Sequence, residues 1–176
     1  LFGASGRMGQ EILRCLEGQT KFEAFLGWSE REKDTGYKHS VTRLDPELVD
    51  KVDLWIDFSS PEALTAAIPK ISRSKKPIIS GTTGMSDVQM KKLKSLTANC
   101  AVMWSSNMSL GIAVLTKTLE HLQMISDFDF QIEEIHHKHK KDAPSGTALS
   151  LQKKLEKVTQ TILPPPLSLR GGGVIG

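Results

Sequence analysis

The feature that most constrains the fold of this chain is an alternation of short apolar runs with amphipathic segments through residues 1–107. The apolar runs predict buried strands, and the segments between them have the apolar spacing of helices. Repeated strand–helix units of this kind predict a parallel sheet with helices on both faces, which is an α/β fold. We expect strands at 22–28, 53–58, 77–80 and 101–104, and helices at 6–16, at 61–71 and after Ser86.

The pattern changes after residue 107. A helix is expected at 110–125, a strand at 128–136 and a helix at 145–157, followed by an extended connector at Pro164–Pro166. We therefore expect a Rossmann-like domain over 1–107 and a smaller α+β domain over 108–176. Only Leu1 and Phe2 precede the first glycine turn, and the chain stops within an RxGxxxG pattern. We interpret the chain as a fragment, or as the ordered part, of a longer protein, with a second domain that is truncated at its C-terminal end.

Composition excludes several classes of protein. The 23 Lys and Arg residues nearly balance 20 Asp and Glu residues, which argues against a dedicated nucleic-acid binder. No apolar stretch has the length of a membrane span, and no signal peptide is visible. Cys15 and Cys100 have apolar neighbours and no pairing pattern. We expect both to be buried free thiols in a reducing cytoplasm.

A glycine motif of the form GxxGxxG spans Gly3 to Gly9, between the expected first strand and first helix. In that position, backbone amides and the helix dipole would face a dinucleotide pyrophosphate, and Arg7 would add a charge-assisted contact. The alternative is a turn that only packs a helix on a sheet. The coenzyme-binding residues expected here are Gly3, Ala4, Ser5, Gly6, Arg7 and Met8.

An acidic residue near the end of the second strand would accept the ribose hydroxyls of the coenzyme. Glu30 is the candidate, while Arg31 or Lys33 could instead hold the 2′-phosphate of NADPH. The sequence therefore leaves NADH and NADPH open. A solvated turn over residues 29–33 is the alternative.

A basic segment at 136–141 contains three histidines and three lysines and leads into Asp142-Ala143-Pro144-Ser145-Gly146-Thr147. If this segment is extended, side chains alternate, so that His137 and His139 face one way while His136 faces the other. At most two imidazoles then converge among ammonium groups, so we expect no metal site. A solvated basic surface is the other alternative, but it would not explain Ser145 as a helix cap whose first turn holds a carboxylate.

Together, the glycine motif and the HHxHKxDAPSGTA run closely resemble the dihydrodipicolinate reductase family. The resemblance implies reduction of dihydrodipicolinate, formed from 4-hydroxy-tetrahydrodipicolinate, with NADH or NADPH in diaminopimelate and lysine biosynthesis. It implies a homotetramer in the bacterial cytoplasm, or in a plastid if the source is a plant, and a cyclic dicarboxylate substrate.

The same resemblance implies roles for individual residues. His136 and Lys140 would carry the acid–base chemistry, although the spacing leaves open which of them delivers the proton. Substrate would be held by His137, Gly146 and Thr147. The nicotinamide end of the coenzyme would be lined by Gly81, Thr82, Thr83, Ser105, Ser106, Asn107 and Met108.

Two other functions stay open on the sequence. Another Rossmann-fold NAD(P)-dependent dehydrogenase of amino-acid metabolism would share the glycine motif but has no need of the basic segment. A non-catalytic dinucleotide-binding module would keep Gly3, Gly6 and Gly9 and lose that segment, which is intact here.

Overall fold

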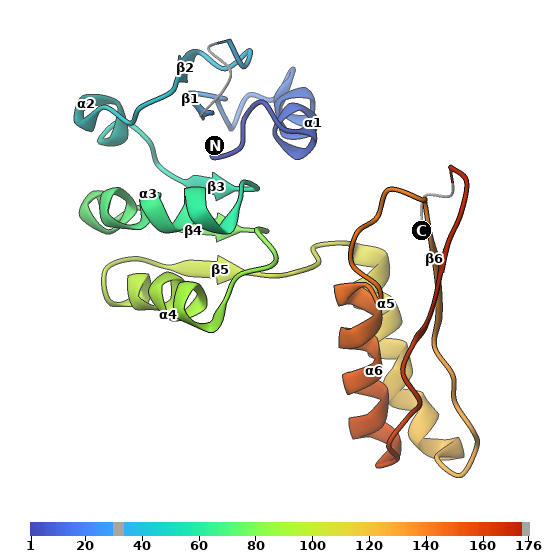
Figure 1. Cartoon of the computed structure of the whole chain (residues 1–176). Helices are drawn as coiled ribbons and strands as arrows, with labels where there is room; N and C mark the ends of the chain where they lie inside the picture. Colours follow the sequence, from blue (N-terminus) through green and yellow to red (C-terminus); the bar gives the residue numbers. More distant parts are fainter. Residues whose placement is uncertain (30–33, 174–176) are drawn as a thin grey trace. The chain divides into compact units, whose positions relative to one another are not determined.

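A computed structural model describes residues 1–29 and 34–173, and the chain divides into two compact units, Leu1–Ser105 and Ser106–Gly176 (Figure 1). The change in the sequence pattern placed the boundary after residue 107. Among the described residues, no helix combines the length and the apolar character that crossing a membrane requires.

Unit 1 contains a parallel sheet. Its strands are β1 (Leu26–Trp28), β2 (His39–Val41), β3 (Trp55–Asp57), β4 (Ile78–Ser80) and β5 (Val102–Trp104). Phe2 forms parallel bridges with Trp28 on one side and Asp57 on the other, so the order across the sheet is β2, β1, Phe2, β3, β4, β5. The winding reverses between Phe2 and β3, and open α/β sheets bind ligands beyond the carboxyl ends of their strands at such a switch point.

The helices of unit 1 begin where short polar side chains can cap them. They are α1 (Arg7–Leu16), α2 (Pro46–Val49), α3 (Pro61–Ser74) and α4 (Asp87–Ser95), which continues into the 3₁₀ turn η1 (Leu96–Ala98). Ser60 accepts a hydrogen bond of 3.2 Å from the amide of Ala63, and Pro61 stands at the first position of α3. Ser86 and Gln89 form a capping box at the start of α4.

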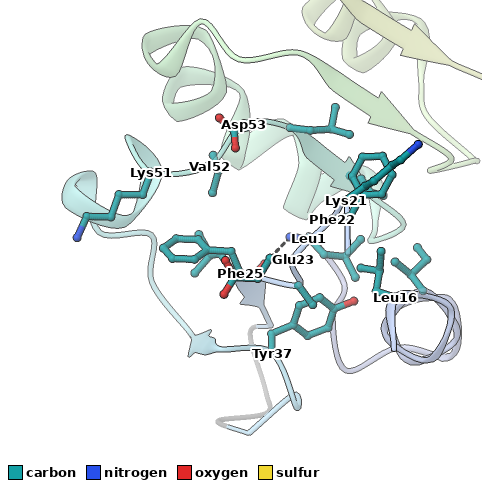
Figure 2. A pocket seen from close by; sticks show the side chains of 15 residues that line it. Leu1, Leu16, Lys21, Phe22, Glu23, Phe25, Tyr37, Lys51, Val52 and Asp53 are labelled. Atoms are coloured by element: carbon teal, nitrogen blue, oxygen red, sulfur yellow. Dashed lines mark hydrogen bonds between the residues drawn. The ribbon is translucent and has the colours of Figure 1, made fainter. Parts of the chain in front are cut away.

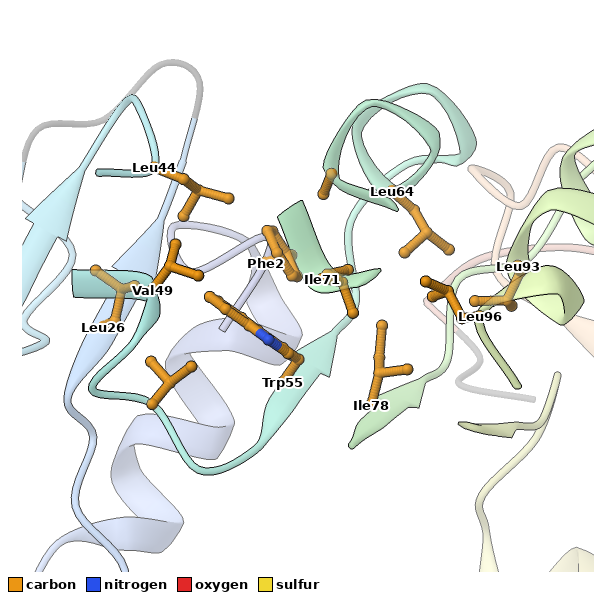
Figure 3. Packing of buried hydrophobic residues seen from close by; sticks show 12 residues of the cluster. Phe2, Leu26, Leu44, Val49, Trp55, Leu64, Ile71, Ile78, Leu93 and Leu96 are labelled. Atoms are coloured by element: carbon orange, nitrogen blue, oxygen red, sulfur yellow. The ribbon is translucent and has the colours of Figure 1, made fainter. Parts of the chain in front are cut away.

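Aromatic rings fill the centre of the unit 1 core (Figure 3). The ring of Phe2 stacks on Trp55 at 5.1 Å between centroids and meets Trp28 edge-on at 5.6 Å. The Trp55 indole also donates a hydrogen bond of 3.0 Å to Ser74 at the end of α3. These contacts fix the strands on both sides of the switch point. The surrounding buried residues are Leu26, Leu44, Val49, Val52, Leu64, Ala67, Ile71, Ile78, Leu93 and Leu96.

Unit 2 is a β–α–β arrangement beside two helical segments. Its elements are α5 (Leu110–Thr118), the 3₁₀ segment η2 (Leu119–Ile125), β6 (Glu133–His136), α6 (Gly146–Thr159) and β7 (Leu167–Arg170). Strands β6 and β7 are parallel, and α6 forms the crossover between them. Helix α6 runs beside α5 and η2 (Figure 1), and Lys154 pairs with Glu120 at 2.6 Å. The Ala143–Pro144 peptide bond is cis.

The predicted fold class is confirmed, but several element bounds differ from the predictions. The strand expected at 128–136 is shorter because its ladder begins with Glu133 opposite Leu167, and the preceding Pro164–Pro166 lack the amide hydrogens to extend it. The strand expected at 22–28 pairs with β2 only from Leu26, opposite His39. The helix expected at 110–125 becomes a 3₁₀ segment after Thr118, and the sequence did not predict β2 or α2.

The burial predicted for both cysteines is wrong for Cys15. This residue is exposed on α1, whereas Cys100 is partly buried, and both thiols are free. Ile12 and Leu13 pack against the core, and the helical period turns Cys15 outward. Apolar neighbours in sequence were therefore a poor guide to the environment of this side chain.

Candidate functional site

A cavity of about 510 Å³ lies at the amino ends of β1 and β3 (Figure 2). Leu1, Phe22, Lys51 and Asp53 contribute to its lining. It contains none of the predicted site residues that the structure describes. Parallel sheets bind ligands at the opposite edge, so the candidate site in unit 1 is the carboxyl edge of the strands.

Glycines are required in the loop that follows Phe2. Gly3 has φ of +78°, and a Cβ there would lie 2.5 Å from the carbonyl oxygen of Phe58. A Cβ on Gly9 would lie 2.4 Å from the oxygen of Gly3. These contacts bring α1 close to the sheet. Gly6 stands directly before α1 and has no side chain to cap it, so among the described residues no side chain occupies the amides of the first turn.

Side chains outside the glycine motif hold this loop in place. Gln10 donates hydrogen bonds of 3.0 Å to the carbonyls of Ala4 and Thr35, and the Tyr37 hydroxyl donates one of 2.8 Å to the carbonyl of Gly9. Burial raises the pKa of Tyr37 to about 12, so the phenol stays a neutral donor. Gln10 and Tyr37 were not among the predicted site residues, because their polar groups reach this loop only when the segment before β2 is in place.

Asp57 joins the carboxyl ends of the central strands and was also missed. Its side chain is fully buried, and its Oδ2 accepts a hydrogen bond of 2.6 Å from the Ser80 hydroxyl. Oδ1 accepts hydrogen bonds from the amide and hydroxyl of Ser59. The amide of Ser59 is also 3.1 Å from the hydroxyl of Thr82, which extends the network to the loop after β4. An acidic residue inside an apolar run was the available sequence signal.

The loop after β4 carries three of the predicted coenzyme-binding residues. A Cβ on Gly81 would lie 2.2 Å from the Phe58 ring, so glycine is required for this packing. Thr82 is buried, and its backbone carbonyl accepts a hydrogen bond of 2.9 Å from the Trp104 indole, whereas Thr83 is exposed. The amide of Ser105 donates to the carbonyl of Ser80 at 3.1 Å.

Unit 1 thus holds the predicted residues Gly3–Met8, Gly81–Thr83 and Ser105 in the loops that follow Phe2, β4 and β5 and in the first turn of α1. Ser5 is also linked to the end of β1, because its hydroxyl lies 2.7 Å from that of Ser29. The predicted ribose residue Glu30, and the alternatives Arg31 and Lys33, lie outside the described residues. What the structure describes fits the pyrophosphate end of a dinucleotide, with an uncapped helix start beside a glycine cradle.

Unit 2 holds the other predicted residues. The side-chain amide of Asn107 donates a hydrogen bond of 2.9 Å to the Thr147 hydroxyl. A residue expected at the coenzyme therefore lies beside one expected at the substrate. Asn107 also accepts a hydrogen bond of 2.8 Å from the amide of Ser109, the cap of α5. Ser106 and Met108 are exposed on either side of Asn107.

The basic segment turns rather than continuing as a strand. Strand β6 ends at His136, and the amide of Lys140 then donates a hydrogen bond of 3.1 Å to the carbonyl of His137. The alternation of faces that we expected is therefore wrong beyond His136. The rings of His137 and His139 lie 6.1 Å apart, and the amide of His139 donates to the His137 Nδ1 at 3.1 Å. Residues 1–29 and 34–173 contain no cluster of three potential metal ligands.

The start of α6 provides an environment for anions. Ser145 caps the helix by accepting a hydrogen bond of 3.1 Å from the amide of Ala148. The Lys140 ammonium pairs with Asp142 at 2.6 Å, and this hydrogen bond holds the pKa of Asp142 below its usual range. A Cβ added to Gly146 would meet nothing within 4 Å, which leaves open space at the first turn. Lys140 and the N-terminus of α6 thus lie close together in the chain, and each of them favours a bound carboxylate.

Glu134 and Arg170 were not predicted as site residues, yet both contact this region. Arg170 donates a hydrogen bond of 2.8 Å to Glu134, whose other oxygen faces Nδ1 of His136. Residues two apart in a strand share a face, so the Glu–x–His spacing was a signal that sequence reasoning could have used. Arg170 is aligned with His136 on the neighbouring strand, which only the pairing register reveals.

Comparison with known proteins gives consistent results over the whole chain. The family described as "Dihydrodipicolinate reductase, N-terminus" matches residues 1–108, and "Dihydrodipicolinate reductase, C-terminus" matches residues 111–176. A 4-hydroxy-tetrahydrodipicolinate reductase of Bdellovibrio bacteriovorus is 47% identical over 176 residues, which is 100% of this chain and 72% of the relative. The enzyme of that name from Campylobacter jejuni is 34% identical over 100% of this chain and 69% of its own length.

A solved structure shares the fold. It is a dipicolinate-bound dihydrodipicolinate reductase from Paenisporosarcina sp., with a TM-score of 0.75 and 21% sequence identity. The match covers 99% of this chain and 78% of the other. At this level of identity the similarity supports the fold alone.

Proposed function

Because this chain belongs to the dihydrodipicolinate reductase family, we propose that it reduces dihydrodipicolinate, formed from 4-hydroxy-tetrahydrodipicolinate, to tetrahydrodipicolinate. The reductant is NADH or NADPH, and the reaction belongs to diaminopimelate and lysine biosynthesis. The observation that carries the proposal is the basic segment, which leads directly into the start of α6 with Lys140, Ser145 and Thr147 close in sequence. A dinucleotide-binding module without catalysis would have no use for it.

The carboxyl edge of unit 1 binds the coenzyme. The uncapped start of α1 receives the pyrophosphate, and Arg7 adds a cation there. Gly81, Thr82, Thr83 and Ser105 to Met108 line the nicotinamide end, in part through their backbone groups. Glu30 is the residue we assign to the ribose hydroxyls.

The basic segment and the start of α6 bind the substrate. His137 and Lys140 are cations or hydrogen-bond donors for a dianionic ring, and Gly146 with Thr147 holds one carboxylate at the helix N-terminus. Since Lys140 pairs with Asp142 in the free chain, a substrate carboxylate must share or replace that partner. Asn107 fixes the hydroxyl of Thr147 through their shared hydrogen bond.

The chemistry requires a hydride and a proton. The nicotinamide coenzyme, when bound, supplies the hydride that adds to the ring carbon conjugated with the imine. The negative charge that develops on the substrate is stabilised by Lys140 and His137 and then quenched by a proton from His136 or Lys140. Water excluded from this site would otherwise weaken those electrostatic interactions.

The experiment that tests the site assignment separates chemistry from binding in the full-length enzyme. His136→Gln should lower kcat by about 10²–10⁴-fold, the usual contribution of a general acid, while coenzyme affinity barely changes. Lys140→Ala should also lower kcat and raise KM for the substrate. The loss in the double variant should be well below the product of the single losses if the two groups act as a unit.

Lys138→Ala is the matched control, because Lys138 is exposed in the same segment and has no assigned role. It should stay within about threefold of the parent. Equally mild effects of His136→Gln and Lys138→Ala would mean that the segment only attracts the dianion, and the acid–base assignment would be wrong.

A further inference from the structure

Glu134 is a buried carboxylate on the face of β6 that also carries His136. Its side chain is only 9% exposed, and its Cα partner on β7 is Ser168. Glu133, the preceding residue, is exposed on the opposite face of the strand. A carboxylate in such surroundings needs several hydrogen-bond donors to remain there.

The Oε1 atom of Glu134 has two donors from other elements. Arg170 on β7 donates through Nη2 at 2.8 Å, and the amide of Ser145, the cap of α6, donates at 3.3 Å. The same Nη2 of Arg170 donates to the carbonyl of Asp142 at 2.5 Å. One carboxylate and one guanidinium thus tie β6, β7 and the loop before α6 together.

The Oε2 atom of Glu134 faces Nδ1 of His136. Both atoms are buried, and among the described residues neither has another hydrogen-bonding partner. A carboxylate without a proton can only accept, so the proton of this contact belongs to Nδ1. The second ring nitrogen, Nε2, lies on the other side of the imidazole and is left for other partners.

Glu134 is ionised despite its burial. Burial favours the neutral acid, but hydrogen bonds from Arg170 and Ser145, the nearby Ser168 hydroxyl and the charge of His136 lower its pKa to about 2. The hydroxyl of Ser168 is buried near the carboxylate, and among the described residues it has no other hydrogen-bonding partner. The acceptor that faces Nδ1 is therefore charged across the whole range in which such an enzyme works.

We propose that Glu134, held in place by Arg170, is the positioning residue for His136: it fixes the proton on Nδ1, so that Nε2 is the nitrogen that exchanges a proton with the substrate. This inference rests on the proposed function, in which His136 takes part in proton transfer. It explains why an arginine that belongs to neither the coenzyme site nor the basic segment is aligned with His136 across the strand pair.

The proton transfer from His136 to the substrate is balanced. The imidazolium loses the hydrogen on Nε2, the electron pair of that bond stays on the nitrogen, and the proton bonds to the substrate atom that became electron-rich when hydride arrived. The ring is then neutral with its hydrogen on Nδ1, held by Glu134. Nε2 regains a proton from water before the next turnover.

The first test reads the tautomer of His136 by ¹⁵N NMR in the full-length protein, at a pH where the ring shifts themselves show a neutral imidazole. The parent should have the hydrogen on Nδ1. A hydrogen on Nε2 in the parent would overturn the inference without any mutation.

Glu134→Gln provides the second test. The donors Arg170 and Ser145 should keep the amide oxygen of the new side chain on their side, so that its NH₂ group faces Nδ1. Nδ1 must then accept, and the hydrogen should move to Nε2. We expect kcat to fall by about 10²-fold or more, as in other enzymes where the wrong histidine tautomer is imposed, with coenzyme Kd within about twofold of the parent.

Glu133→Gln is the matched control, because it removes the neighbouring carboxylate from the exposed face of β6. It should change neither the tautomer nor kcat. Arg170→Lys keeps the positive charge but cannot bind Glu134 and the Asp142 carbonyl in the same geometry, so it should reproduce part of the loss in kcat.

The outcomes separate this inference from the proposed function. If Glu134→Gln moves the hydrogen to Nε2 but leaves kcat unchanged, His136 does not transfer the proton and the proposed function of that residue fails. If kcat falls in His136→Gln while Glu134→Gln changes neither the tautomer nor kcat, His136 keeps its role and the positioning by Glu134 is wrong.

Discussion

At the residue scale, the site depends on two buried carboxylates that hold other groups in place. Asp57 fixes the loops after β3 and β4 in unit 1, and Glu134 fixes His136 and the start of α6 in unit 2. Neither was among the predicted site residues. The side chains expected to touch ligands were visible as motifs, whereas the side chains that hold them depend on contacts between distant segments.

Replacing Asp57 tests the first of these carboxylates. Asp57→Ala should lower the free energy of unfolding by about 2–4 kcal/mol, because the hydroxyl of Ser80 and the groups of Ser59 lose their buried acceptor. Denaturant titration at one protein concentration measures the change. Asp53→Ala, at a fully exposed side chain, should stay within about 0.5 kcal/mol of the parent. Equal effects of the two variants would mean that the Asp57 network adds no stability.

At the scale of the elements, the sequence was most informative where local chemistry decides the structure. Ser60 with Pro61, Ser86 with Gln89, and Ser145 each cap the helix that their neighbours predicted. Strand ends were less predictable because they depend on the partner. The start of β6 follows from the prolines before β7, which lie more than thirty residues later in the chain. The short β2 and α2 carry little periodicity of their own.

The contact between η2 and α6 leads to a pH-dependent prediction. Hydrogen bonds from Lys117 and Lys154 lower the pKa of Glu120 from 4.5 to about 2. Because the pKa is lower in the folded chain, this carboxylate stabilises the fold above pH 4.5, and that contribution is lost as the pH falls toward 2. The side chain is 39% exposed, so salt should weaken the effect.

The measurement compares the unfolding free energy of the parent and of Glu120→Gln at about pH 6 and about pH 3. The variant should lose less stability between the two pH values, and the difference should shrink in high salt. Glu17→Gln, which removes an exposed carboxylate at the end of α1, should behave like the parent. A loss in Glu120→Gln as large as in the parent would contradict the role of the two lysines.

At the scale of the whole molecule, family membership connects two units that the structure describes separately. Unit 1 carries the features of a dinucleotide site, and unit 2 carries the basic segment and the helix start that suit a dicarboxylate. The α/β class was predictable, and both motifs could be located from the sequence because each motif is continuous in it. The Glu134–His136–Arg170 arrangement was not, because it needs the register of β6 and β7.

The outer face of the β6–β7 pair bears on self-association. Ile135, Leu167 and Leu169 are each about half exposed and are aligned on that face. An apolar surface of this kind favours burial against further strands or another subunit. We propose that the full-length enzyme is a homotetramer, and sedimentation at micromolar concentration should reveal a species of four chains. A single monomeric species would contradict this.

The proposed reduction of a cyclic dicarboxylate is tested by the activity of the full-length protein. Oxidation of NADH or NADPH should be followed at its near-ultraviolet absorbance, with freshly made 4-hydroxy-tetrahydrodipicolinate as substrate. Aspartate semialdehyde, a substrate for other Rossmann-fold dehydrogenases of amino-acid metabolism, serves as the comparison. We expect rapid coenzyme oxidation that requires the cyclic dicarboxylate and is absent with the semialdehyde. Coenzyme binding without oxidation, or oxidation only with the semialdehyde, would contradict it.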